Sequence, residues 1–246
     1  MQVLAIDSAM NGCQAGVYEI NEESQDVCVL AQDKLEVTRG QAEHLMPMIE
    51  RVMKKSGRVY SDIDLIGVTN GPGAFTGMRI AIATAKAVAL AADKPVVGVS
   101  TISAVLDSFL SQQTPEEPIF PYCAVILETK RKDYYFQLFE LGADIKHASM
   151  EAVIEAEPAR VASAFEIFSI ISKKEAVLIG DAVERLMSEC DGARLNQIIT
   201  MPRGDSIAKL AVSAYKTKGG EYGCKPHYLR EPEIGKAKVR PRVLKE

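Results

Sequence analysis

The sequence predicts an α/β fold, and the prediction depends mainly on a strand–helix–strand unit over residues 65–100. The apolar run 65–68 is typical of a buried strand and is followed by a loop of glycine and proline. A helix that Thr76 caps is expected to run through residues 78–92, before a β-branched strand at 96–99. Such a unit places two parallel strands in one sheet, with the helix on its face.

Three further strands and one helix are expected before this unit. Apolar runs predict strands at 3–6, 15–20 and 27–35, and a turn signal separates the first two. Apolar residues at helical spacing predict a helix over 41–55, in which Pro47 either causes a kink or lies in the first turn. The first hundred residues should therefore form an antiparallel start followed by the strand–helix–strand unit.

The second half of the chain predicts another, smaller lobe. The expected strands are 124–127, 134–141 and 176–179, and the expected helices are 102–112, 158–168, 182–190 and 205–215. The stretch 114–118, rich in proline and glutamate, is the best linker candidate. We therefore divide the chain into an N-terminal lobe (1–104), a C-terminal lobe (105–224) and a basic tail (225–246).

Composition sets the outer limits on function. The chain has 246 residues, of which 47% are hydrophobic and 25% charged, as in ordinary globular proteins. The net charge of -4 argues against a broad nucleic-acid-binding surface. The first residues enter a strand without a secretion signal, and the cysteines form no CxxC pair, so we expect a cytoplasmic protein with reduced thiols. These cysteines are Cys13, Cys28, Cys123, Cys190 and Cys224.

The histidines do not predict a metal site. A helical zinc or iron pair needs a second histidine three or four positions after His44, and those positions hold Pro47 and Met48. His147 and His227 have no motif around them. We therefore expect no bound metal.

The glycine loop and the end of the first strand form a candidate nucleotide or phosphate site. Backbone N–H groups of a glycine-rich turn before a helix can bind an anion, and a carboxylate at a strand end suits a phosphate or its magnesium ion. The spacing, however, fits neither GxxxxGK(S/T) nor GxGxxG, so a tight turn shaped for packing remains the alternative. The candidate residues are Asp7, Ser8, Gly71, Gly73, Thr76 and Arg79.

Two helices carry more apolar surface than one sheet needs. The helix over 78–92 has almost no polar stripe, which predicts cover on more than one side. Its length and the presence of Lys86 argue against a membrane span, so a helix of this chain or of a partner should cover it. The expected partner surface comprises Leu45, Met46, Met48, Ile49, Met53, Ile82, Ala85 and Ala89.

Five stretches of the sequence form recognisable motifs. They are Asp7-Ser8-Ala9, Glu43-His44-Leu45-Met46-Pro47, Gly71-Pro72-Gly73-Ala74-Phe75-Thr76-Gly77-Met78-Arg79, Gly98-Val99-Ser100-Thr101 and Pro226-His227-Tyr228-Leu229-Arg230. Together these motifs resemble the TsaB (YeaZ) family, non-catalytic relatives of TsaD in tRNA threonylcarbamoyladenosine biosynthesis. The resemblance is strong over residues 1 to about 105 and weaker beyond.

The resemblance implies a two-lobed ASKHA fold (actin, Hsp70 and sugar-kinase-like) with mixed sheets flanked by helices. It further implies a scaffold that has no activity by itself. This scaffold would bind TsaD through the two apolar helices, and TsaE through that pair. The complex would transfer threonylcarbamoyl to the adenosine 3′ of the anticodon in tRNAs that read codons starting with A. Contact of this chain with tRNA would be indirect, and the lone chain could form a homodimer through the same helices.

Departures from the family pattern limit the chemistry. TsaD-type relatives carry an HxxxH metal pair where this chain has Met48, so a metallopeptidase is disfavoured. The second lobe has Glu128-Thr129-Lys130 and Lys132 where the family usually has Asp-Ala-Arg and glycine, and a lysine obstructs close approach of a phosphate. We expect no tightly bound cofactor, with ATP and magnesium only in the complex.

Two alternatives stay open. The chain could be an ASKHA-type ATPase or phosphotransferase that acts on its own through Asp7 and the glycine loop. The basic tail could lie against tRNA phosphates or remain solvated. Its charged residues are Lys225, Arg230, Glu231, Glu233, Lys236, Lys238, Arg240, Arg242, Lys245 and Glu246.

Overall fold

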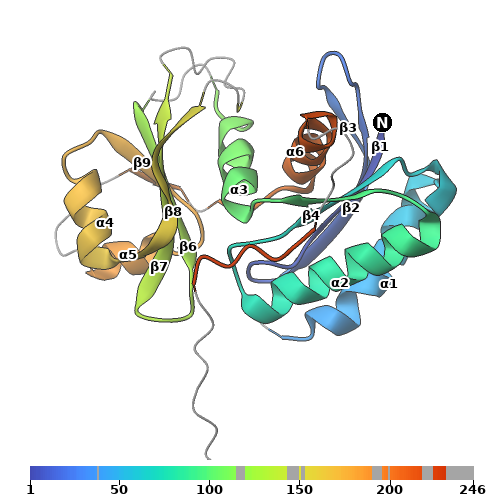
Figure 1. Ribbon diagram of the computed structural model, residues 1–246, viewed down its shortest axis with the longest axis horizontal. Helices are drawn as coiled ribbons and strands as arrows, with labels where there is room; N and C mark the ends of the chain where they lie inside the picture. The colour runs from blue at the N-terminus through green and yellow to red at the C-terminus, as the bar shows by residue number, and fades with distance from the viewer. Residues whose placement is uncertain are drawn as a thin grey trace, which may run out of the picture.

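The fold consists of two lobes, each built around a mixed five-stranded sheet (Figure 1). It is seen in a computed structural model that describes residues 1–37, 39–114, 120–142, 150, 153–189, 196–198, 200–217 and 224–230. Both sheets share one plan, in which an antiparallel three-stranded start is extended by two parallel strands. The predicted α/β class and two-lobed architecture are confirmed.

The N-terminal sheet has the strand order β3-β2-β1-β4-β5. Its strands are β1 (Gln2–Asp7), β2 (Cys13–Ile20), β3 (Val27–Leu35), β4 (Leu65–Thr69) and β5 (Val96–Val99). Helices α1 (Gln41–Ser56) and α2 (Phe75–Ala92) cover one face, and a short 3-10 helix, η1 (Tyr60–Asp62), precedes β4. Because side chains alternate along a strand, Leu4 and Ile6 of β1 face these helices, whereas Val3 and Ala5 face the opposite side.

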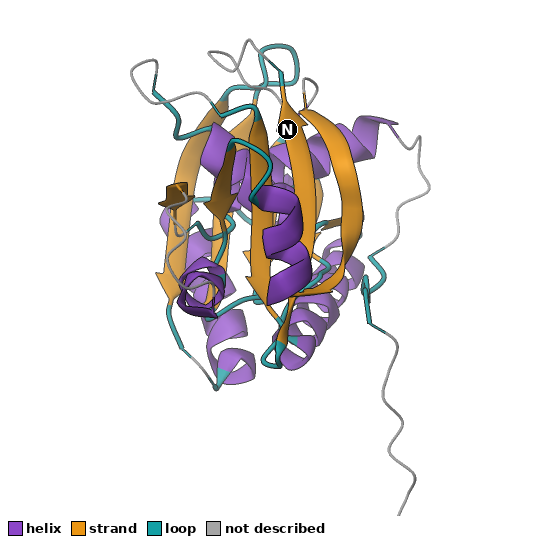
Figure 2. Cartoon of the chain, turned by 90° about the vertical axis from the view of Figure 1, so that its left-hand side faces the viewer, coloured by secondary structure: helices purple, strands orange, loops and turns teal. Residues whose placement is uncertain are grey.

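The C-terminal sheet has the corresponding order β10-β9-β6-β7-β8. Its strands are β6 (Tyr122–Glu128), β7 (Asp133–Leu141), β8 (Val153–Ser163), β9 (Ala176–Ile179) and β10 (Asn196–Ile198). Helices α4 (Ala164–Ile171) and α5 (Val183–Glu189) cover its outer face. Figure 2, in which this lobe faces the viewer, shows helices lying in front of the strands.

Two helices fill the space between the sheets (Figure 1). Helix α3 (Thr101–Leu110) packs on the inner face of the C-terminal sheet, and α6 (Gly204–Thr217) packs on the inner face of the N-terminal sheet. The expected lobe boundary at 104/105 therefore falls inside α3. Helix α6, which was expected in the C-terminal lobe, belongs to the N-terminal lobe. Its residues Ile207 and Ala211 pack against Val3, Ala5 and other residues of the first sheet.

Two local predictions are wrong. The helix expected at 158–168 is strand β8 as far as Ser163, where a capping box with Glu166 starts α4. Proline is tolerated at position 158 because β8 is an edge strand. Thr76 does not cap α2, since Ala74 is the N-cap residue and makes no side-chain capping bond. Of the predicted linker, residues 115–118 lie outside the described residues.

Helix α2 is long and apolar enough to cross a membrane by length and composition alone. One of its faces, however, is buried against the N-terminal sheet, through residues that include Ala81, Ala85 and Val88. Packing inside the chain therefore accounts for much of its apolar character.

Candidate functional site

The glycine loop before α2 and the first turn of that helix, which contains Gly77, pack directly on the turn that follows β1. A Cβ atom added to Gly73 would lie 2.2 Å from the carbonyl oxygen of Ala9, and one added to Gly77 would lie 2.0 Å from that of Ser8. The backbone N–H of Ala74 donates to the Ala9 carbonyl at 2.6 Å. Glycine is therefore required here because two backbones of the same chain touch.

Asp7 is buried and its carboxylate is used within the fold. It accepts hydrogen bonds from the hydroxyl of Thr69, from the backbone N–H of Ala9 at 2.9 Å and from Nε2 of Gln14 at 3.2 Å. Burial raises the pKa of this carboxyl above its usual value, and the hydrogen bonds oppose that shift only in part. Asp7 thus ties β1 to β4 and to β2.

The other candidate phosphate residues do not converge on one cavity. The hydroxyl of Ser8 is buried and donates to the carbonyl of Gly12 at 3.2 Å, whereas Thr76 and Arg79 are exposed on α2. Gly73 lines a cavity of about 10 Å³, which has room for about one water molecule. The structure favours the interpretation of the loop as a packing turn.

The segment 224–230, which we call the C-terminal segment, lies across the mouth of this loop. The N–H of His227 donates to the carbonyl of Asn70 at 2.7 Å, and Nδ2 of Asn70 donates to the carbonyl of Lys225 at 3.1 Å. A Cβ atom on Gly71 would lie 2.7 Å from the carbonyl oxygen of His227. The chain's own backbone therefore occupies the space beside Gly71.

The C-terminal segment then crosses to the other lobe, as the red trace between α2 and β6 in Figure 1 shows. Leu229 packs against the core cluster of α3 and the C-terminal sheet, and the guanidinium of Arg230 pairs with Asp133. Burial acts to raise the pKa of Asp133, but hydrogen bonds from Thr129 and Arg230 outweigh it and lower the pKa. Sequence reasoning singled out the 226–230 motif but did not predict that it joins the lobes.

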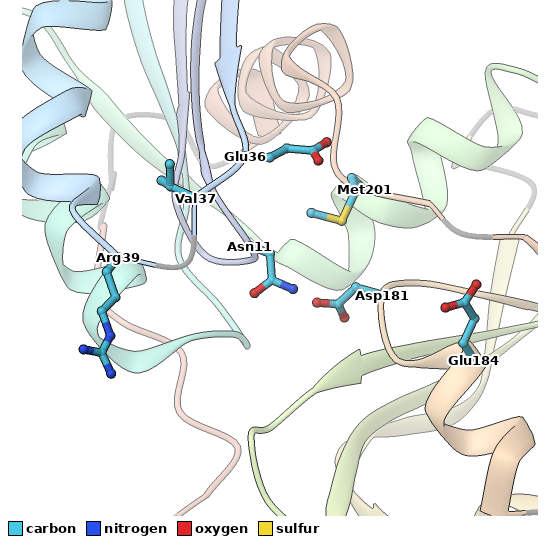
Figure 3. Close-up of a pocket in the computed structure, with 7 residues that line it drawn as sticks. All are labelled: Asn11, Glu36, Val37, Arg39, Asp181, Glu184 and Met201. Atoms are coloured by element: carbon cyan, nitrogen blue, oxygen red, sulfur yellow. The ribbon is translucent and has the colours of Figure 1, made fainter.

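A larger cleft opens between the lobes, with a volume of about 700 Å³. In Figure 3 the side chains of Asn11 and Asp181 lie near each other in its centre, one from each lobe. Nζ of Lys130 donates to Oδ1 of Asn11 at 2.9 Å, which links the lobes at this point. Carboxylates outnumber cations among the residues that line the cleft, which are Asn11, Glu36, Val37, Arg39, Asp181, Glu184 and Met201. Such a lining disfavours a polyphosphate ligand.

The expected partner surface needs correction. Of its residues, all but Met46 are buried against the chain's own sheet: Leu45, Met48, Ile49, Met53, Ile82, Ala85 and Ala89. Their regular helical spacing marks the face that covers the sheet. Met46 is 37% exposed, so only this member of the set is available to another molecule in the folded chain.

The outer faces of α1 and α2 nevertheless form an apolar groove of about 340 Å³. We call it the α1–α2 groove; it is lined by Met46, Glu50, Tyr60, Ala87, Val88, Ala91 and Ala92. Beside it, Leu90 is 85% exposed. Among the described residues, no group of three or more His, Cys, Asp or Glu side chains could hold a metal ion.

Comparisons with a family model and with individual known proteins point to the same family. The family model of TsaD, tRNA N6-adenosine threonylcarbamoyltransferase, matches residues 35–193. TsaB from Escherichia coli is 35% identical over 102 residues, which cover 42% of this chain and 41% of that protein. TsaB from Buchnera aphidicola subsp. Baizongia pistaciae is 26% identical over 233 residues, 93% of this chain and 98% of that protein. The first match thus spans less than half of the Escherichia coli relative.

Among solved structures, YeaZ from Pseudomonas aeruginosa superimposes with a TM-score of 0.73 at 20% sequence identity, covering 93% of this chain and 99% of that one. Two mixed sheets of the same strand order, with helices between and outside them, define a two-lobed α/β protein that shares the fold of YeaZ. Within that class, the chain belongs to the TsaB (YeaZ) family of TsaD relatives.

Proposed function

We propose that this chain is an accessory subunit in tRNA threonylcarbamoyladenosine biosynthesis, and that it binds a TsaD-type threonylcarbamoyltransferase without carrying out the transfer itself. Family membership supports the pathway, since the relatives named above are TsaB proteins. TsaE would join through the TsaB–TsaD pair.

The observation that carries the proposal is the α1–α2 groove. Leu90, at 85% exposure, is the most exposed large hydrophobic side chain among the described residues, and Met46 lies on the neighbouring helix. Exposed apolar surface rimmed by polar residues is typical of a protein–protein interface. A helix pair of similar shape on TsaD could lay its apolar ridge into the groove.

The closed glycine loop supports a non-catalytic role. Gly73 and Gly77 face backbone of the same chain, the C-terminal segment covers Gly71, and the carboxylate of Asp7 is held by three partners. Met48, at the position of the second histidine of the HxxxH pair in TsaD-type relatives, is buried in the core. The transfer chemistry would then belong to the partner.

A reconstitution experiment tests this role. The purified chain alone should show no turnover of Mg-ATP and no modification of tRNA. Added to TsaD and TsaE with tRNA and the threonylcarbamoyl donor, it should restore modification of the adenosine beside the anticodon. Mg-ATP turnover by the lone chain that is lost in Asp7→Ala would contradict the proposal and favour an independent ASKHA-type ATPase.

A further inference from the structure

Three side chains form an exposed stack where α2 meets the C-terminal segment. The guanidinium carbon of Arg79 lies 3.8 Å from the ring centre of Phe75 and 5.6 Å from that of Tyr228. The two ring centres are 5.6 Å apart with an interplanar angle of 30°. Nε of Arg79 donates to the hydroxyl of Tyr228 at 2.7 Å, so the hydrogen bond fixes the stack.

The rings remain open to solvent although they are ordered by these contacts. Phe75 is 53% exposed and Tyr228 is 42% exposed. A phenylalanine that served only to anchor the C-terminal segment would gain most from full burial. The stack therefore presents a fixed aromatic and guanidinium surface to solvent.

The charges around the stack select the kind of molecule. The first turn of α2 contains no acidic residue, and Lys225 and His227 are exposed on the adjoining segment. A flat aromatic surface beside positive charge is complementary to unpaired nucleotides, whose bases stack on aromatic and arginine planes while phosphates meet lysine.

We infer that the Phe75–Arg79–Tyr228 stack binds an unpaired base of an RNA loop directly, with Lys225 near the adjoining phosphates. The choice of RNA over DNA rests on the proposed function in tRNA modification. The stack is separate from the α1–α2 groove, because Phe75 precedes Ala87 by 12 helical positions, or about 18 Å at 1.5 Å per residue. RNA and the protein partner can therefore be tested independently.

The test uses the full chain and an RNA hairpin that carries 2-aminopurine, a fluorescent adenine analogue, in its loop. Stacking quenches this fluorophore, and anisotropy of an end-labelled hairpin gives the affinity. Phe75→Ala should weaken binding about 10-fold and abolish the quench. Phe75→Leu, which keeps apolar packing but removes the ring, should do the same. Tyr228→Phe, which keeps the ring, should retain most of the quench.

Matched controls separate a local effect from a general one. Phe165 is also an exposed phenylalanine, at 82%, but lies on α4 of the other lobe, so Phe165→Ala should leave RNA binding unchanged. Lys225→Ala should weaken binding of all RNA sequences and reduce its salt dependence, without removing the residual quench at saturation.

Two results would overturn the inference. One is that folded Phe75→Ala and Phe75→Leu bind the hairpin and quench it as the unmodified chain does. The other is that these variants lose TsaD binding while the RNA signal stays the same, which would make the stack a protein contact. Variants in the α1–α2 groove that lose TsaD binding and keep the RNA quench would not contradict this inference. The proposed TsaD binding by the groove and the inferred RNA binding by the stack are therefore tested separately.

Discussion

Nε of Arg79 on α2 donates a hydrogen bond to the hydroxyl of Tyr228 at 2.7 Å, across 149 positions of the chain. Two residues further on, Arg230 pairs with Asp133, the first residue of β7. One short segment thus holds the start of a helix in the first lobe and a strand end in the second. It follows that the glycine loop is covered whenever the segment is docked.

Docking of the C-terminal segment should be measurable at Cys224. This thiol is buried in the core cluster of α1 and α2, and burial raises its pKa to about 11. We predict that Arg230→Ala, which removes the pair with Asp133, increases the rate of Cys224 labelling by a thiol reagent several-fold. Mass spectrometry of the labelled peptides gives the rate, and exposed Cys28 provides an internal standard.

Lys132→Ala is the matched control, since this exposed cation lies directly before Asp133, in the turn that precedes β7. It should leave the Cys224 rate unchanged. If Cys224 of the unmodified chain were labelled as fast as Cys28, the segment would not be docked in solution.

Close backbone packing at the glycine loop makes Gly77 sensitive to any side chain. A Cβ there would lie 2.0 Å from the Ser8 carbonyl oxygen, which belongs to backbone and cannot move aside easily. Gly77→Ala should lower the free energy of unfolding by about 3 kcal/mol, measured by urea denaturation. Thr76→Ala, at an exposed position with no capping bond, should change it by less than about 0.5 kcal/mol. Similar stabilities of the two variants would mean that the loop can be displaced from β1.

Asp7 gives a pH-dependent prediction. Burial raises the pKa of its carboxyl above 3.8, so the folded chain binds this proton more tightly than the unfolded chain does. The resulting stabilisation is present below about pH 4 and is lost as pH rises through the folded pKa. Asp7→Asn cannot lose a proton, so the stability of the variant relative to the unmodified chain should improve between pH 4 and pH 7.

Thermal unfolding across that pH range measures the difference. Asp93→Asn is the control, because Asp93 is exposed and its left-handed backbone suits asparagine. The stability of this variant relative to the unmodified chain should not change with pH. A difference for Asp7→Asn that worsens with rising pH would show that the hydrogen bonds from Thr69 and Gln14 outweigh burial.

The order of strands and helices could be predicted where the apolar periodicity was strong. The unit β4–α2–β5 is an example, because a run of β-branched residues and a long apolar helix leave few alternatives. Strand β8 was missed because its glutamate, alanine and arginine residues favour a helix locally, whereas pairing with β7 decides the conformation. Local preference cannot reveal that pairing.

The site was less predictable for a related reason. Apolar spacing identifies buried positions such as Met48 and Ala85, but it does not say whether the chain's own sheet or a partner covers them. The residues of α2 that stay exposed, Ala87, Leu90 and Ala91, are known only once the sheet has been placed. The docking of the C-terminal segment likewise depends on contacts between distant parts of the chain, which no local pattern records.

The central claim is that the α1–α2 groove binds a TsaD-type partner, and titration calorimetry with TsaD tests it most directly. Ala87→Arg places a charge on an exposed position, so the free chain should fold normally while docking would bury the unpaired charge. We predict binding weaker by about 100-fold or more, whereas Ser213→Arg on the exposed side of α6 should bind as the unmodified chain does. Unchanged affinity of folded Ala87→Arg for TsaD would contradict the claim.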